Sequence, residues 1–222
     1  MIVPDGTLVL TLAPDNVSNA TLTAEDGTVL YTVSTAHGDK TTTSVRNASD
    51  EVLATLEWRD VLPDRVAVGG AKQISMGDWM KRSMIPFKDD ITFTDDQGRK
   101  YKWRGNSAGR SFELSCADDN YATVIARFER SRRVYPSSTV PANQDPSASV
   151  PSLAPTLVNP AWTPALLTLT PRAQQIQDTV VTSFLFLEKT RRTAETQSQV
   201  RADAVGTPLK PVGKSAMVNG GV

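Results

Sequence analysis

The chain has 222 residues, of which 39% are apolar and 22% charged, as in an ordinary globular protein with one substantial core. Basic and acidic residues number 24 each, so the overall charge favours neither nucleic acid nor acidic substrates, and such binding would need a local patch. The single cysteine, Cys116, excludes an intramolecular disulfide. The longest apolar run, residues 180–187, is too short to span a bilayer.

Short alternating strands separated by turn signals are predicted over the first 135 residues. In the first of them, Leu8, Leu10 and Leu12 share one face. The turn Glu25-Asp26-Gly27 predicts a hairpin within residues 21–35, because glycine tolerates the positive φ of such a turn. Further strands are predicted at residues 41–46, 51–59, 91–94, 99–104, 112–116 and 121–128. This regular spacing, interrupted only by a helical turn that Ser75 caps, favours a barrel or sandwich over a parallel α/β sheet.

The character of the sequence changes at residues 136–164, where seven prolines lie among small polar residues. A packed strand cannot accommodate so many missing N–H donors, so we predict a disordered or extended insertion there. Residues 165–169 return as a strand. The last 27 residues, 196–222, are polar with several glycines and prolines, and they are predicted to form a disordered tail.

The best helix is predicted from Pro171 to about Glu195. Thr170 precedes it as a cap, and a proline in the first turn loses no hydrogen bond. Its middle, residues 180–187, is apolar nearly all round, which indicates a helix buried on all sides. Amphipathic strands need an apolar element to enclose, so we expect one domain, residues 1–195, built as a closed antiparallel β-barrel around this helix.

Several short motifs recur in the order found in a known family. They are Asp26-Gly27 with Tyr31-Thr32-Val33, Thr41-Thr42-Thr43 with Arg46, Leu53-Ala54-Thr55-Leu56-Glu57-Trp58, Gly98-Arg99-Lys100-Tyr101-Lys102-Trp103, Ile125-Ala126-Arg127-Phe128, and Asp178-Thr179-Val180-Val181 through Arg191-Arg192. The chain resembles an uncharacterised fungal family of unknown function and, more distantly, the tubby and LURP-one/scramblase-like barrels. This resemblance implies a roughly twelve-stranded barrel around a central helix. Tubby proteins bind phosphoinositides and scramblases are associated with membranes, but no tubby headgroup-binding residue is placed on this chain.

The strongest local feature is basic. Within residues 99–104 the cations alternate with Tyr101 and Trp103, so the cations are expected on one strand face and the aromatic rings in the core. The candidates for binding an anion or lipid headgroup are Lys100, Lys102, Arg104, Arg99 and Arg110. The alternative is a solvated strand face that discourages edge-to-edge aggregation.

Other chemistry-bearing residues fit structural roles. A second group of cations either extends the basic face or solubilises a strand end; it comprises Arg127, Arg130, Arg132 and Arg133. Acidic pairs such as Asp95-Asp96 fit hairpin turns. One histidine, His37, and one cysteine cannot build a zinc site. We therefore predict no catalytic site, no metal and no cofactor.

The sequence leads us to expect a non-enzymatic binding domain, with anionic phospholipid headgroups as the most specific ligand. The alternative is a protein-interaction or scaffold domain that uses the Pro-rich insertion or the tail. Nucleic acid is not expected as a partner, because inward-pointing aromatic side chains cannot stack on bases. The N-terminus lacks the features of a signal peptide, so we expect a cytoplasmic location. We also expect a monomer, which would attach peripherally to membranes if headgroups are its ligand.

Overall fold

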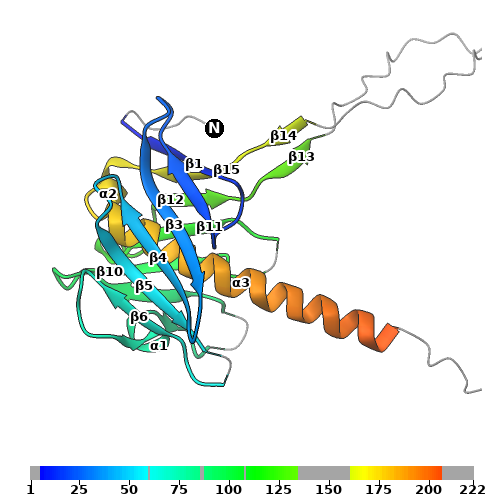
Figure 1. Cartoon of the computed structure of the whole chain (residues 1–222). Helices are drawn as coiled ribbons and strands as arrows, with labels where there is room; N and C mark the ends of the chain where they lie inside the picture. Colours follow the sequence, from blue (N-terminus) through cyan, green and yellow to red (C-terminus); the bar gives the residue numbers. More distant parts are fainter. Residues whose placement is uncertain (1–5, 60, 86–87, 108, 135–160, 207–222) are drawn as a thin grey trace, which may run out of the picture.

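The computed structural model describes residues 6–59, 61–85, 88–107, 109–134 and 161–206. Most of this part of the chain forms one antiparallel sheet (Figure 1). Its strands are β1 (Leu8–Ala13), β2 (Ala20–Thr23), β3 (Val29–His37), β4 (Thr41–Asn47), β5 (Val52–Trp58), β6 (Arg65–Val68), β7 (Ile74–Ser75), β8 (Lys81–Arg82), β9 (Ile91–Thr94), β10 (Lys100–Arg104), β11 (Phe112–Cys116), β12 (Val124–Glu129) and β15 (Ala165–Leu169). The remaining elements are β13 (Arg132–Val134), β14 (Ala161–Thr163), a 3-10 turn (Ala117–Asp119), α1 (Met76–Trp79), α2 (Pro171–Gln174) and α3 (Gln177–Gly206).

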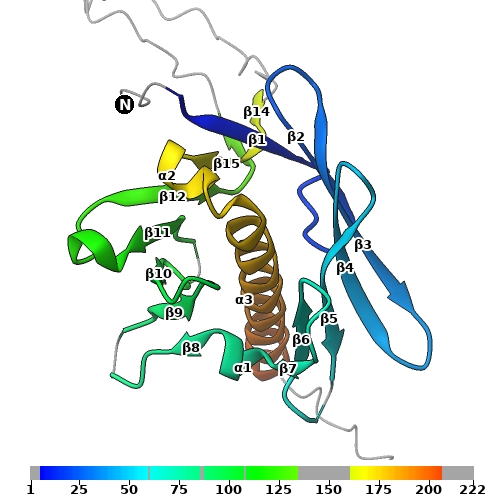
Figure 2. The same ribbon diagram turned by 90° about the vertical axis from the view of Figure 1, so that its left-hand side faces the viewer.

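The strands lie in the order β7-β6-β5-β4-β3-β2-β1-β15-β12-β11-β10-β9-β8. Most neighbours are consecutive in the chain and joined by tight turns, such as the β2–β3 turn at Gly27, whose φ is +84°. The exception is β15, which pairs with both β1 and β12 and so joins the first strands to the later ones. Figure 2 shows the resulting sheet curving around α3.

The prediction of a closed barrel is wrong. The sheet ends at β7 and β8, and these two strands do not pair with each other. Between them the chain forms α1, where the Ser75 hydroxyl accepts a hydrogen bond from the backbone N–H of Asp78 at 3.1 Å, as predicted for that cap. The segment therefore makes its hydrogen bonds within a helical turn instead of a ladder, and a seam is left between the two sheet edges.

The core lies between the concave face of the sheet and the first half of α3. Phe184 is fully buried there, with its ring 4.7 Å from that of Phe128. The indole N–H of Trp103 donates to the Ser183 hydroxyl at 3.0 Å, which satisfies two polar groups in an otherwise apolar interior. The predicted burial of this helix is confirmed by its fully enclosed side chains from Val180 through Glu188.

The predicted ends of the helical region need correction. Residues 171–195 form the short α2 followed by α3, and α3 continues to Gly206, so the tail predicted from residue 196 is wrong over 196–206. No glycine or proline interrupts the chain between Pro171 and Gly206, and a polar stretch remains helical where it projects from the sheet (Figure 1). No helix in the described ranges is long and apolar enough to cross a membrane.

The Pro-rich insertion is also shorter than predicted at its C-terminal end. Ala161–Thr163 forms β14, which pairs with β13 in a separate two-stranded ribbon. This ribbon stands away from the main sheet (Figure 1). Residues 136–160 of the predicted insertion and 207–222 of the predicted tail lie outside the described residues.

Candidate functional site

The basic strand of the sequence analysis is β10, at the side of the sheet next to β9 and β8. Tyr101 and Trp103 are buried in the core, as predicted. The residues between and beside them, Lys100, Lys102 and Arg104, therefore lie on the opposite, outer face of the sheet, since side chains alternate along a strand.

Two of the five predicted anion-binding residues do not join this face. Arg99 turns back to Asp95, with Nε 2.7 Å from Oδ2, and this hydrogen bond raises the pKa of the guanidinium further. Arg110 lies in the loop before β11 and lines a different hollow, next to Arg130 and Arg132.

Lys102 and Arg104 are on the outer face but partly engaged. The ammonium of Lys102 lies 3.9 Å from the centre of the Tyr121 ring and 3.8 Å from the Asp90 carboxylate. Arg104 donates to the backbone carbonyl of Tyr121 at 3.3 Å. Lys100 is thus the least engaged of the predicted cations.

The sheet register adds a cation that the sequence analysis did not select. Lys81 of β8 pairs with Thr92 of β9, which pairs with Lys102 of β10, so the three side chains form a row on one face. A two-residue strand has no periodicity to recognise, so the sequence alone does not mark Lys81. Only the register brings it beside the basic strand.

Lys81 and Lys100 line a groove of about 390 Å³ at the seam between the sheet edges, which we call the seam groove. Its other polar lining residues are Asp78, Thr92, Thr94, Trp79 and Tyr121. None of the ion pairs within the described ranges involves Lys81 or Lys100. With Lys102 at its edge, the groove has three cations and two nearby carboxylates, that of Asp78 within it and that of Asp90 beside it. Hydroxyl groups also line it.

Two of the four cations in the second basic group of the sequence analysis, Arg127 and Arg130, are neutralised by carboxylates. Arg127 forms an ion pair with Glu113 at 2.6 Å, and Arg133 lies over the Trp162 ring at 4.8 Å. Arg130 turns inward and binds Glu188 of α3, a carboxylate with no solvent exposure. These cations therefore do not extend the basic face of β10.

Glu188 is the centre of a buried charge cluster, which we call the Glu188 cluster. Its carboxylate also contacts Arg192 at 2.6 Å and Arg191 at 2.5 Å. Glu195 and Asp15 complete the cluster by pairing with Arg130 and Arg192. Three arginines thus meet three carboxylates. Arg191 also donates to the carbonyls of Gly105 and Arg110, at 2.8 and 2.6 Å. The cluster ties α3 to the segment that follows β12 and to the β1–β2 and β10–β11 loops, which is a structural role.

Replacing Asp15 by asparagine is expected to make the free energy of unfolding less dependent on pH in the acidic range. Partial burial acts to raise the pKa of Asp15, but hydrogen bonds from Ser131 and Arg192 outweigh it and hold the pKa below its ordinary value. A carboxyl group whose pKa is lower in the folded than in the unfolded state contributes stability at pH values above its unfolded-state pKa. This stability is lost as the pH falls through its folded-state pKa. At pH 7, urea denaturation should therefore give the wild type a free energy of unfolding roughly 1 kcal/mol larger than that of the variant. This difference should narrow below about pH 4. A gap that stays constant with pH would contradict this assignment.

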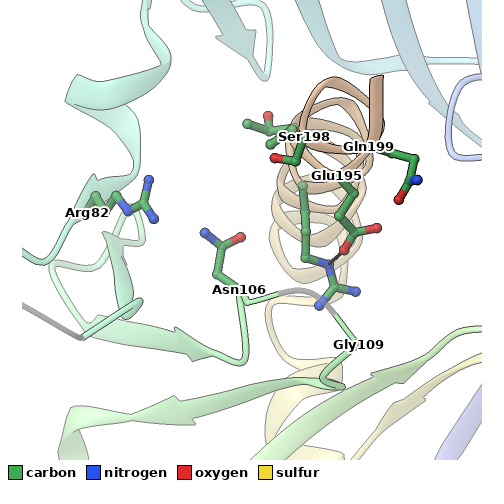
Figure 3. A pocket seen from close by; sticks show the side chains of 9 residues that line it. Arg82, Asn106, Gly109, Glu195, Ser198 and Gln199 are labelled. Carbon is green, nitrogen blue, oxygen red and sulfur yellow. Dashed lines mark ion pairs between the residues drawn. The ribbon is translucent and has the colours of Figure 1, made fainter. Parts of the chain in front are cut away.

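A second cavity, of about 610 Å³, flanks the projecting half of α3. Arg82 and Asn106 face Ser198 across it, and the paired Arg191 and Glu195 lie beside them (Figure 3). Six of the nine lining residues belong to the Glu188 cluster or to exposed positions of α3, so the cavity offers fewer free charges than the seam groove.

The remaining candidates of the sequence analysis have local partners. His37 is the last residue of β3, and its Nδ1 lies 3.3 Å from the Thr41 hydroxyl. Asp95 accepts backbone hydrogen bonds from Gln97 and Arg99 within its turn, as predicted. In the part of the chain that the structure describes, no group of three His, Cys, Asp or Glu side chains could hold a metal ion.

Comparison with known proteins identifies a family. The model described as "Family of unknown function (DUF6593)" matches residues 15–193. The X-ray structure of a protein from Arabidopsis thaliana is similar with a TM-score of 0.47 and 12% sequence identity, over 85% of this chain and 93% of that one. No curated protein matches the chain.

Proposed function

The chain belongs to the DUF6593 family, whose function is unknown, and we propose from the seam groove that it is a non-enzymatic domain binding the phosphate-bearing headgroup of an anionic lipid. The observation that carries this proposal is the pair Lys81 and Lys100, two cations that line one groove and take part in none of the ion pairs within the described ranges. The more distant resemblance to tubby and scramblase-like proteins stays a prediction and supports the proposal only by analogy.

The groove offers the groups that bind a phosphate. Ammonium groups on flexible stems can follow a phosphate ester, and the hydroxyl of Thr94 can donate to its oxygens. A volume of about 390 Å³ is at the lower end of the range for small-ligand sites and suits a headgroup, whose acyl chains would remain outside.

Exposed apolar side chains close to Lys81 in the chain favour a lipid over a free phosphate. Met84 and Ile85, in the loop that follows β8, are 98% and 57% exposed. They lie three and four residues beyond Lys81, and exposed apolar side chains beside cations are typical of surfaces that contact an anionic membrane.

The double substitution Lys81→Glu with Lys100→Glu is expected to weaken vesicle binding by about 2 kcal/mol, roughly 30-fold, because each cation near an anionic surface contributes about 1 kcal/mol. The measurement is co-sedimentation with phosphatidylcholine vesicles with and without phosphoinositide, at low and high salt. The matched control is Arg132→Glu with Arg201→Glu, two exposed cations far from the groove that change the net charge equally.

The outcomes separate the sources of the anion and the classes of function. Inhibition by soluble inositol phosphates with no effect of Met84→Ser would indicate a free ligand. Equal losses of vesicle binding in both double variants would show that net charge, and not the groove, causes the effect. If the wild type binds none of the vesicles, the alternative of a protein-interaction domain remains. For that function the β13–β14 ribbon offers Trp162, which is 62% exposed.

A further inference from the structure

A large hollow flanks α3 on the side of β4 and β5. It has a volume of about 870 Å³, and we call it the lysine cavity because Lys189 of α3 lies in its wall. Trp58 and Asp64 line it as well. The cavity is distinct from the seam groove, and the headgroup proposal makes no use of it.

Lys189 is held by an aromatic ring and a hydroxyl instead of a carboxylate. Its Nζ lies 4.3 Å from the centre of the Trp58 ring and 3.1 Å from the Thr43 hydroxyl. None of the ion pairs among the described residues includes Lys189. An amine in this position is fixed in place without being locked into its charged form by a contacting anion.

The hydrogen bonds around Thr43 define what the amine can do. Thr35 donates its hydroxyl proton to the carbonyl of Ser18 at 2.7 Å, so the proton of Thr43 goes to the Thr35 oxygen. The Thr43 oxygen then accepts from the indole of Trp58 and from Lys189. A neutral amine keeps this bond with one N–H, and its lone pair remains free.

The charges that face the cavity do little to favour the ammonium form. They belong to Asp39, Lys40, Glu57, Arg59 and Asp64. Glu57 is occupied by Lys40 and Arg59, at 3.1 and 3.2 Å. Asp64 accepts a hydrogen bond from the backbone of Arg59, and burial raises its pKa. Burial lowers the pKa of Lys189, and the charge of Asp64 opposes this shift.

We propose that Lys189 is a covalent-modification site, at which small aldehydes that enter the lysine cavity are captured as an imine. The lone pair of Nζ adds to the carbonyl carbon and gives a carbinolamine. The carbonyl oxygen then leaves as water with the two amine protons, and a C=N bond remains. No oxidant or reductant is consumed, and water is the only by-product.

The test is reductive trapping on the full chain with limiting acetaldehyde and cyanoborohydride, followed by peptide mass spectrometry. At pH 7 Lys189 is expected to be labelled several-fold faster than Lys40, which lies at the same cavity and is 63% exposed in its side chain. The advantage should shrink toward pH 10, where all lysines lose their protons. Equal or slower labelling of Lys189 at pH 7 would overturn the proposal, including the case in which the amine is simply inaccessible.

Two variants sharpen the result. Asp64→Asn removes the one charge that favours the ammonium and should speed labelling of Lys189 while leaving Lys100 unchanged. Lys189→Arg keeps a cation over Trp58 and should abolish the label at that peptide alone. If the rapid label is found on Lys40 or Lys100 in both variants, the reactive amine is not Lys189.

Discussion

The substitution Phe184→Asp is expected to abolish folding. Phe184 has no solvent exposure and packs against Phe128 at the centre of the curved sheet. Loss of a buried phenylalanine costs about 3–5 kcal/mol by itself, and a buried carboxylate without a partner adds a further large cost. The sum is comparable to the whole stability of a typical domain, about 5–15 kcal/mol. The expected result is insoluble or non-cooperative protein, read by circular dichroism and urea denaturation.

The control for this prediction lies in the same helix. Val200 is 61% exposed on the projecting half of α3, so Val200→Asp should change the stability by less than about 0.5 kcal/mol. Phe184→Leu should remain folded with a moderate loss. If Phe184→Asp unfolds cooperatively near the wild-type midpoint, the buried placement of this half of the helix is wrong.

The substitution Glu188→Gln has the second largest expected effect. It would leave Arg130, Arg191 and Arg192 without their shared buried carboxylate. Breaking a buried ion pair from one side typically costs about 3–5 kcal/mol, because an uncompensated charge stays in the interior. For a chain of this length that lowers Tm by roughly 6 °C or more, which calorimetry would measure.

Two further variants separate burial from charge. Glu195→Gln removes a carboxylate that is 28% exposed, and it should cost about 1 kcal/mol or less. Glu188→Leu combined with Arg191→Met removes the carboxylate together with the most buried of its three arginine partners, so it should cost less than Glu188→Gln, apart from the bonds of Arg191 to the carbonyls of Gly105 and Arg110. Equal losses at Glu188 and Glu195 would show that the Glu188 cluster is solvated.

Much of the local structure follows from the order of residues. Alternation placed Tyr101 and Trp103 in the core, the cap at Ser75 is where the residue type predicts it, and the apolar residues 180–187 are buried. These features depend on neighbours within a few positions, whose side-chain period and turn chemistry can be read directly.

The candidate site was only half predicted. Lys100 and Lys102 were recognised because they alternate with aromatic residues, whereas Lys81 and Lys189 carry no local signal. Arg130 looked like part of a basic surface, yet it is paired with Glu188, 58 positions away in the chain. Whether a cation is free or neutralised depends on partners distant in sequence, which a local pattern cannot show.

The sequence by itself therefore determined most of the strands, though not β6, β7, β8, β13 or β14, and it determined which faces they bury and that one C-terminal helix is enclosed. Only the tertiary structure decided that β15 lies between β1 and β12, that the sheet stays open at α1, and that α3 runs on to Gly206. Backbone ladder hydrogen bonds are chemically alike at every strand, so their pairing depends on the global packing of side chains. The seam groove exists because that packing ended the sheet in a helical turn instead of a last ladder.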